Sequence, residues 1–208
     1  MLEVTDLECV RGNRALFAGV SFALRGGELL RAAGANGSGK TSLLRIVCGL
    51  LVPTRGEVRW RGSNIRSLRE DYGRQLLYVG HTNAVKDDLT AIENLAVSCT
   101  LAGILVSGDQ VRAALHRLGL AGCEKLPVRV LSQGQRRRLA LARLALGESV
   151  PLWVLDEPFT ALDAAAVDCV QTLIMEQLGR GAAVIFTTHQ DQLAAAITFC
   201  INLDSRAC

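Results

Sequence analysis

Apolar residues follow two patterns along the chain, and the two predict different elements. Short apolar runs bounded by glycine or polar residues predict strands, over residues 1–10, 16–24, 28–33, 58–60, 76–79, 152–155, 183–187 and 199–203. Apolar positions three or four residues apart predict helices, over residues 41–49, 91–120, 133–146 and 164–178. A break near Gly108 divides the second of these helical stretches.

Apolar strands that alternate with helices indicate a parallel sheet covered on both faces. At the start of the chain, two predicted strands are separated only by a turn at Gly12-Asn13. We therefore expect an α/β fold with a mixed sheet, in a single domain over residues 1–208. The change to helical spacing predicts a small inserted helical subdomain, at about residues 83–147, between core segments 1–82 and 148–208.

Composition and charge narrow the picture. Half of the 208 residues are hydrophobic, which suits one globular domain. A net charge of +3 is too small to indicate a nucleic-acid partner, and we expect none. The one dense basic patch, Arg136-Arg137-Arg138, favours a solvated helix face. The seven cysteines form no C-x-x-C pair, so a reducing cytosol fits better than a disulfide scaffold.

The candidate chemistry begins at a glycine-rich loop between a predicted strand and a predicted helix. The loop reads Gly34-Ala35-Asn36-Gly37-Ser38-Gly39-Lys40-Thr41 and matches the pattern G-x-x-x-x-G-K-[ST]. Its glycines allow several backbone N–H groups to point into one concavity, and the helix N-terminus favours phosphate there. Lys40 can reach the β- and γ-phosphates of a nucleotide, and the Thr41 hydroxyl can ligate Mg²⁺.

Two carboxylates follow the apolar run 152–155. In open parallel sheets, ligands bind at the carboxyl ends of the strands, where Asp156 and Glu157 are expected to lie. Asp156 is predicted to hold Mg²⁺, and Glu157 to polarise the attacking water as general base. Together with the glycine-rich loop, this pair still leaves kinases, GTPases and repair ATPases open.

A third motif, just before the predicted helix 133–146, distinguishes among these classes. It reads Leu131-Ser132-Gln133-Gly134-Gln135. A serine hydroxyl, a glycine backbone and a helix N-terminus together form a second phosphate-binding surface. Since residues 34–41 already supply one phosphate site, the second is expected to serve the γ-phosphate bound by a neighbouring copy.

These motifs, in this order, resemble those of the ATP-binding cassette family over nearly the whole chain. Gln133 replaces the first glycine of the family's Leu-Ser-Gly-Gly-Gln signature. Ala161-Leu162-Asp163 resembles the D-loop, and Thr187-Thr188-His189 resembles the segment that carries the switch histidine. The resemblance implies an ATPase with Mg²⁺ that works as a homodimer with shared ATP sites, and it implies that His189 contacts the γ-phosphate.

A narrower resemblance is to the members of this family that serve cytochrome c maturation. It is carried by residues 60–62, 77–81, 85–95 and 153–159. The resemblance implies a membrane permease subunit as partner and a peripheral position at the cytoplasmic face of a bacterial inner membrane. Haem export and haem delivery both fit this role. The ATP-binding subunit of another exporter is an alternative, and a soluble cassette ATPase that acts on ribosomes or DNA is less favoured.

Three positions depart from the family pattern. His81 stands where the family has a glutamine near the hydrolysis site, so we expect His81 to take that catalytic place; the alternative is that it only packs the loop. Arg11 stands where an aromatic residue stacks on adenine, and a guanidinium plane can also stack on a base. Ala35 replaces the usual proline of the glycine-rich loop, which is expected to loosen the loop slightly without removing a backbone N–H donor.

Overall fold

A five-stranded parallel sheet lies at the centre of the computed structural model, which describes residues 1–188 and 193–204. The strand order is β6-β7-β8-β3-β9, with bounds Leu76–Val79, Leu152–Leu155, Ala183–Thr187, Leu29–Ala33 and Phe199–Asn202. All residues of β7 and β8 are buried, which explains why both read as continuous apolar runs. The predicted parallel sheet, with strands that alternate with helices along the chain, is confirmed.

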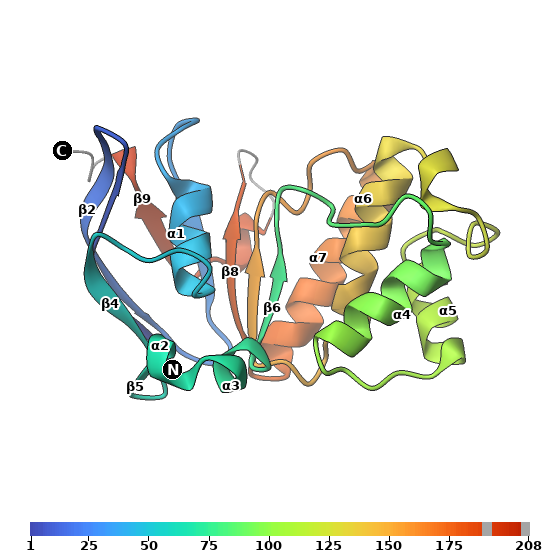
Figure 1. The fold of residues 1–208 in the computed structure, drawn as a ribbon, viewed down its shortest axis with the longest axis horizontal. Helices are drawn as coiled ribbons and strands as arrows, with labels where there is room; N and C mark the ends of the chain where they lie inside the picture. Colours follow the sequence, from blue (N-terminus) through green and yellow to red (C-terminus); the bar gives the residue numbers. More distant parts are fainter. Residues whose placement is uncertain (189–192, 205–208) are drawn as a thin grey trace.

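The strands of a second sheet pair in antiparallel fashion. Its order is β2-β1-β4-β5, with bounds Arg14–Leu24, Leu2–Arg11, Arg55–Trp60 and Ser63–Asn64. β1 pairs with β2 through the predicted turn and with β4 on its other side. The parallel and antiparallel strands expected from the sequence therefore fall into two sheets, side by side in Figure 1.

Helix α1 (Lys40–Val47) lies between these two sheets (Figure 1). Its apolar side chains, such as Leu43 and Val47, share one buried cluster with β1 and β2 and with Ile185 of β8. Two short helices, α2 (Ile65–Leu68) and α3 (Glu70–Gly73), follow the antiparallel sheet and were not predicted. At four residues each, they are too short for a helical repeat of apolar positions to show.

The remaining helices gather on the other side of the parallel sheet (Figure 1). They are α4 (Ala91–Leu101), α5 (Gly108–Arg117), α6 (Gln133–Leu141) and α7 (Ala164–Gly179). Their apolar faces pack into a second buried cluster with β6, β7 and β8. The 3₁₀ turns η1 (Val128–Val130), η2 (Ala142–Leu146) and η3 (Ala194–Ala196) complete the elements of the described residues.

Helix boundaries refine the sequence expectations. Ser107 caps α5 and forms a capping box with Gln110, so the helix begins at Gly108, where a break was predicted. The single helix expected over residues 133–146 is instead α6 followed by η2, because the backbone tightens to 3₁₀ geometry in its last turns. Within the described residues, none of the helices combines the length and hydrophobicity needed to cross a membrane. The subdomain limits at residues 83–147 remain a proposal.

Candidate functional site

The glycine-rich loop joins the end of β3 to the start of α1 in a conformation that requires its glycines. Gly39 has φ +100°, which side-chain-bearing residues rarely adopt. A Cβ at Gly39 would also lie 2.8 Å from Cδ1 of Phe17, a fully buried residue. The loop therefore folds back tightly against β2, as a backbone cradle for phosphate requires.

Two polar contacts fix the ends of this loop. The Lys40 ammonium donates to the carbonyls of Gly34 (2.8 Å) and Ala35 (3.1 Å). The Ala35 N–H donates to both carboxylate oxygens of Asp204, at 3.0 and 2.9 Å. The extra N–H that alanine provides in place of proline is thus used, by a residue next to β9 that sequence reasoning did not identify.

Asp156 is the centre of a hydroxyl–carboxylate cluster at the carboxyl ends of β7 and β8. Its side chain is 1% exposed. Thr41 Oγ1 donates to Asp156 Oδ2 at 2.8 Å, and Thr187 Oγ1 donates to Asp156 Oδ1 at 2.8 Å. Hydroxyl and carboxylate oxygens are the hard donors that Mg²⁺ prefers. The donor set therefore fits the metal that the sequence predicted at Thr41 and Asp156.

Glu157 follows in an uncommon backbone conformation. Its φ is +50°, in the left-handed region, where a residue with a side chain is strained. The Glu157 N–H donates to Thr187 Oγ1 at 2.8 Å. Thr187 thus contacts both carboxylate residues. Strained backbone held by its surroundings is common at functional sites.

One cleft of about 610 Å³ brings these predicted residues together. Its lining comes from β1, β2, the glycine-rich loop, the start of α1, the segment after β6 and the segment after β7. The residues are Arg11, Leu16, Asn36, Gly37, Gly39, Lys40, Thr41, Ser42, His81, Asp156, Glu157 and Thr160. Arg11 and His81 are exposed at this cleft, where each could reach a bound nucleotide. His189 lies outside the described residues.

The Leu131–Gln135 motif lies elsewhere, at the start of α6. Ser132 caps this helix: its Oγ accepts from the Gln135 N–H (3.2 Å), and Gln135 Oε1 accepts from the Ser132 N–H (2.9 Å). A Cβ on Gly134 would lie 3.2 Å from the Ala161 carbonyl, so the motif packs closely on the predicted D-loop. None of its five residues is among the described residues that line the cleft. The motif is thus positioned apart from the phosphate loop of its own chain.

Asp163 of the predicted D-loop has two contacts within the chain. Its Oδ1 accepts from the Ala166 N–H at 3.1 Å, which caps α7, and its Oδ2 pairs with Arg138 at 2.9 Å. Asp163 therefore links the start of α7 to α6.

Comparison with known proteins identifies the family. The family model for ABC transporters matches residues 17–160, more than half of the chain. The chain belongs to the ABC transporter family. Its fold is that of this family's ATP-binding domain: a structure of the ATP-binding subunit of an ABC transporter superposes with a TM-score of 0.82 at 28% identity, over 94% of this chain and 81% of that one.

Relatives within the ABC transporter family narrow the assignment. The cytochrome c biogenesis ATP-binding export protein CcmA of Nitrosomonas europaea is 52% identical over 95% of this chain and 92% of its own length. The CcmA proteins of Nitrosospira multiformis and Vibrio cholerae are 54% and 46% identical, over 91% and 93% of this chain and 92% and 93% of their own. The predicted resemblance to this branch is confirmed. As an ATP-binding member of the ABC family, the chain is an ATPase that converts ATP and water to ADP and phosphate.

The structure corrects the expectation for the basic run Arg136-Arg137-Arg138. Arg137, predicted to lie on a solvated face, is only 4% exposed. Successive helix positions point about 100° apart, so the middle residue of three can face inward while its neighbours do not. Burial lowers the pKa of Arg137, and the Asp156 and Glu157 carboxylates partly offset that effect.

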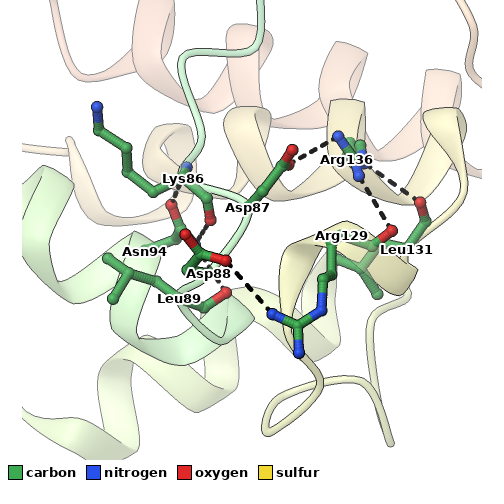
Figure 2. Close-up of polar contacts among 8 residues, drawn as sticks. All are labelled: Lys86, Asp87, Asp88, Leu89, Asn94, Arg129, Leu131 and Arg136. Carbon is green, nitrogen blue, oxygen red and sulfur yellow. Dashed lines mark hydrogen bonds and ion pairs between the residues drawn. The ribbon is translucent and has the colours of Figure 1, made fainter.

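A second polar network joins the segment after His81 to the signature helix (Figure 2). Asp87 pairs with Arg136 at 2.8 Å, and Asp88 pairs with Arg129 at 3.3 Å. Buried Asn94 accepts from the Lys86 N–H at 2.7 Å and donates to the Lys86 carbonyl at 2.9 Å. The segment that leaves the ATP cleft is therefore tied to both α4 and α6.

Sequence reasoning did not identify several residues at the site. They are Arg14, whose Nη1 would lie 3.9 Å from a Cβ on Gly37, together with Leu16, Thr160, Arg137 and Asp204. All of them except Thr160 belong to segments distant in sequence from the residues that they contact. No local pattern therefore marked them.

Proposed function

We propose that this chain is the ATP-hydrolysing subunit of a membrane complex for c-type cytochrome biogenesis, where it drives haem export or haem delivery. The observation that carries the proposal is the 52% identity, over 95% of the chain, to a protein whose name states cytochrome c biogenesis and export. The arrangement of Lys40, Asp156 and Glu157 around one cleft supports the ATP-dependent part of this role.

Nucleotide binding is proposed to use the cleft as follows. The backbone N–H groups of residues 34–41 and the Lys40 ammonium would hold the phosphates. Arg11, exposed at the edge of the cleft, would stack on the adenine. A guanidinium stacks on other bases as well, so the preference for ATP over GTP would be modest.

Hydrolysis is proposed to need Mg²⁺, held by the Thr41 hydroxyl and the Asp156 carboxylate, whose oxygens are 2.8 Å apart. When bound, the metal neutralises charge that develops on the phosphates. Glu157 would accept a proton from the attacking water as general base. His81 lines the same cleft and would face that water. His189 is proposed to contact the γ-phosphate.

The complete site is proposed to form between two copies of the chain. Leu131–Gln135 does not line the cleft of its own chain among the described residues, and its capped helix end would offer a second surface for phosphate. A two-fold dimer would bring this surface to the partner's γ-phosphate. A related structure supports the arrangement: the ATP-binding cassette MJ0796, 25% identical with a TM-score of 0.82 over 97% of this chain and 94% of its own, is a dimer bound to ADP and Pi in a post-hydrolysis state.

The partner in the membrane is proposed to be the permease subunit of the cytochrome c maturation system. The chain would then work as a peripheral subunit at the cytoplasmic face of the bacterial inner membrane. This assignment follows from the function named for the CcmA relatives.

Complementation tests the proposal. The chain would be expressed in a bacterial strain that lacks its own CcmA protein, and covalently bound haem would be measured in its c-type cytochromes. We expect the wild-type chain to restore them, and Glu157→Gln, present at equal abundance, to fail. A wild-type chain that hydrolyses ATP in vitro and reaches the membrane fraction, yet restores no cytochrome, would contradict the biogenesis role and leave the ATPase assignment standing.

A further inference from the structure

Arg137 connects three parts of the ATP site from inside the protein. It lies on α6, in the first turns after the Leu131–Gln135 motif, and is 4% exposed. Its Nη1 donates to the Gly80 carbonyl at 2.9 Å and to Asn83 Oδ1 at 3.4 Å. Its Nη2 donates to the carbonyls of Asp156 at 3.0 Å and Glu157 at 2.7 Å. One guanidinium thus joins residues on either side of His81 to the backbone carbonyls of Asp156 and Glu157.

The hydrogen bond from Arg137 to the Glu157 carbonyl is the shortest of these contacts, and it acts on the residue that is proposed as the general base. Glu157 has φ +50°, a conformation that the surroundings must hold in place. Thr187 fixes its N–H side at 2.8 Å, and Arg137 fixes its carbonyl side at 2.7 Å. These two contacts grip the peptide units on both sides of the Glu157 Cα, and so they set the direction in which its carboxylate leaves the backbone.

The geometry requires arginine. A planar guanidinium offers donors on two separate nitrogens, which here serve two backbone segments at once. A lysine ammonium at this position keeps the charge, but it is a single point on a flexible stem and cannot span both segments. Charge and bridging can therefore be separated by substitution.

We propose that Arg137 is a positioning residue for hydrolysis: it holds the strained Glu157 backbone and the Gly80–Asn83 segment in register with the signature helix. The inference rests on the proposed role of Glu157 as general base. In this proposal α6 has two roles. Its N-terminus faces the nucleotide bound by the partner, and its Arg137 positions Glu157, the general base of its own chain.

Steady-state kinetics of Arg137→Lys test the bridging role. We expect kcat for ATP hydrolysis to fall on the order of 10–100-fold, because a small displacement of a catalytic group can cost that much. The KM for ATP and the Kd for a fluorescent ATP analogue measured without Mg²⁺ should stay within about 3-fold, since the phosphate loop is untouched. A kcat within about 2-fold of wild type would overturn the proposal.

A matched variant controls for simple loss of stability. Gln177 is also buried and donates to two backbone carbonyls, those of Glu148 (3.3 Å) and Val150 (2.8 Å), at the end of β7 away from the cleft. Gln177→Met should lower the melting temperature yet leave kcat near wild type well below that temperature. If both variants lose activity in proportion to their loss of stability, Arg137 is structural only and the proposal fails.

Hydrogen–deuterium exchange gives a readout that does not depend on turnover. Arg137→Lys should accelerate amide exchange in residues 80–84 and at residues 156 and 157 together, and Gln177→Met should not. Unchanged exchange in both segments would overturn the bridging role even if the wild-type chain were inactive. If Glu157→Gln and Arg137→Lys both keep ATPase activity, the result would instead contradict the role of Glu157 as general base, and with it the proposed function.

Should the lysine variant fail to fold, a crystal structure of the wild-type chain with a non-hydrolysable ATP analogue decides the matter. The proposal requires Arg137 to keep its bonds to both the Gly80 and the Glu157 carbonyls when nucleotide is bound. Loss of either bond in that structure would refute it.

Discussion

Lys40 illustrates how a single residue is prepared for phosphate. Its ammonium already lies inside the loop, where it donates to the Gly34 and Ala35 carbonyls. Bound β- and γ-phosphates would offer it charged acceptors, which form stronger hydrogen bonds than carbonyls. The sequence predicted this role from the spacing of the loop alone, because the motif is contiguous and its glycines permit backbone conformations that other residues rarely adopt.

Lys40→Ala should therefore weaken ATP binding by at least about 10-fold, since one charge-assisted contact to phosphate contributes about 1.5–3 kcal/mol, and should abolish turnover. Titration with a fluorescent ATP analogue and a phosphate-release assay would measure the two effects. Lys125→Ala is the control, because Lys125 is exposed and is not among the residues that line the cleft. Full hydrolysis by the Lys40→Ala protein would refute the assignment of the phosphate loop.

At the element scale, the segment between His81 and α4 depends on one buried side chain. Asn94, 5% exposed, accepts from the Lys86 N–H and donates to the carbonyls of Lys86, Leu89 and Thr90. Figure 2 shows the Lys86 contacts beside the two ion pairs to Arg129 and Arg136. The exposed ion pairs are expected to contribute little, because solvent screens them. Asn94 is therefore expected to contribute more to the stability of this segment than the two ion pairs do.

Asn94→Ala should destabilise the fold by roughly 1–3 kcal/mol, since it leaves several buried backbone groups without a partner. Urea denaturation followed by circular dichroism would measure the loss. Ser98→Ala, on the same helix and outside this hydrogen-bond set, should change stability by less than about 0.5 kcal/mol. Equal effects of the two substitutions would show that the segment is held by other contacts.

At the scale of the whole molecule, the two surfaces proposed to bind phosphate lie on different parts of the chain. The glycine-rich loop precedes α1, between the two sheets, and the signature motif precedes α6 in the helical group (Figure 1). Among the described residues, the lining of the cleft includes the glycine-rich loop and the two carboxylates, but none of the signature motif. Such an arrangement suits a site that only a second copy completes.

Glu157→Gln tests that arrangement. The amide is close in size to the carboxylate but cannot accept a proton as a general base, so ATP should bind and remain intact. At saturating Mg-ATP the variant should accumulate a dimer, visible as a doubling of mass by light scattering, and ADP should return it to monomer. The same substitution combined with Lys40→Ala, which removes phosphate binding, should stay monomeric. A Glu157→Gln protein that stays monomeric with ATP bound would count against the shared site.

The sequence by itself determined the phosphate loop, the carboxylate pair, the alternation of strands and helices, and the family. These features are local: contiguous motifs and apolar spacing depend on few residues. Only the tertiary structure decided that Arg137 is buried against the Gly80 and Glu157 carbonyls, and that Asp204 holds the Ala35 N–H. Residues 35 and 204 lie 169 positions apart in the sequence. They meet because β3 and β9 are neighbouring strands in the parallel sheet. Contacts of this kind depend on which strands become neighbours, and no short pattern in the sequence specifies that.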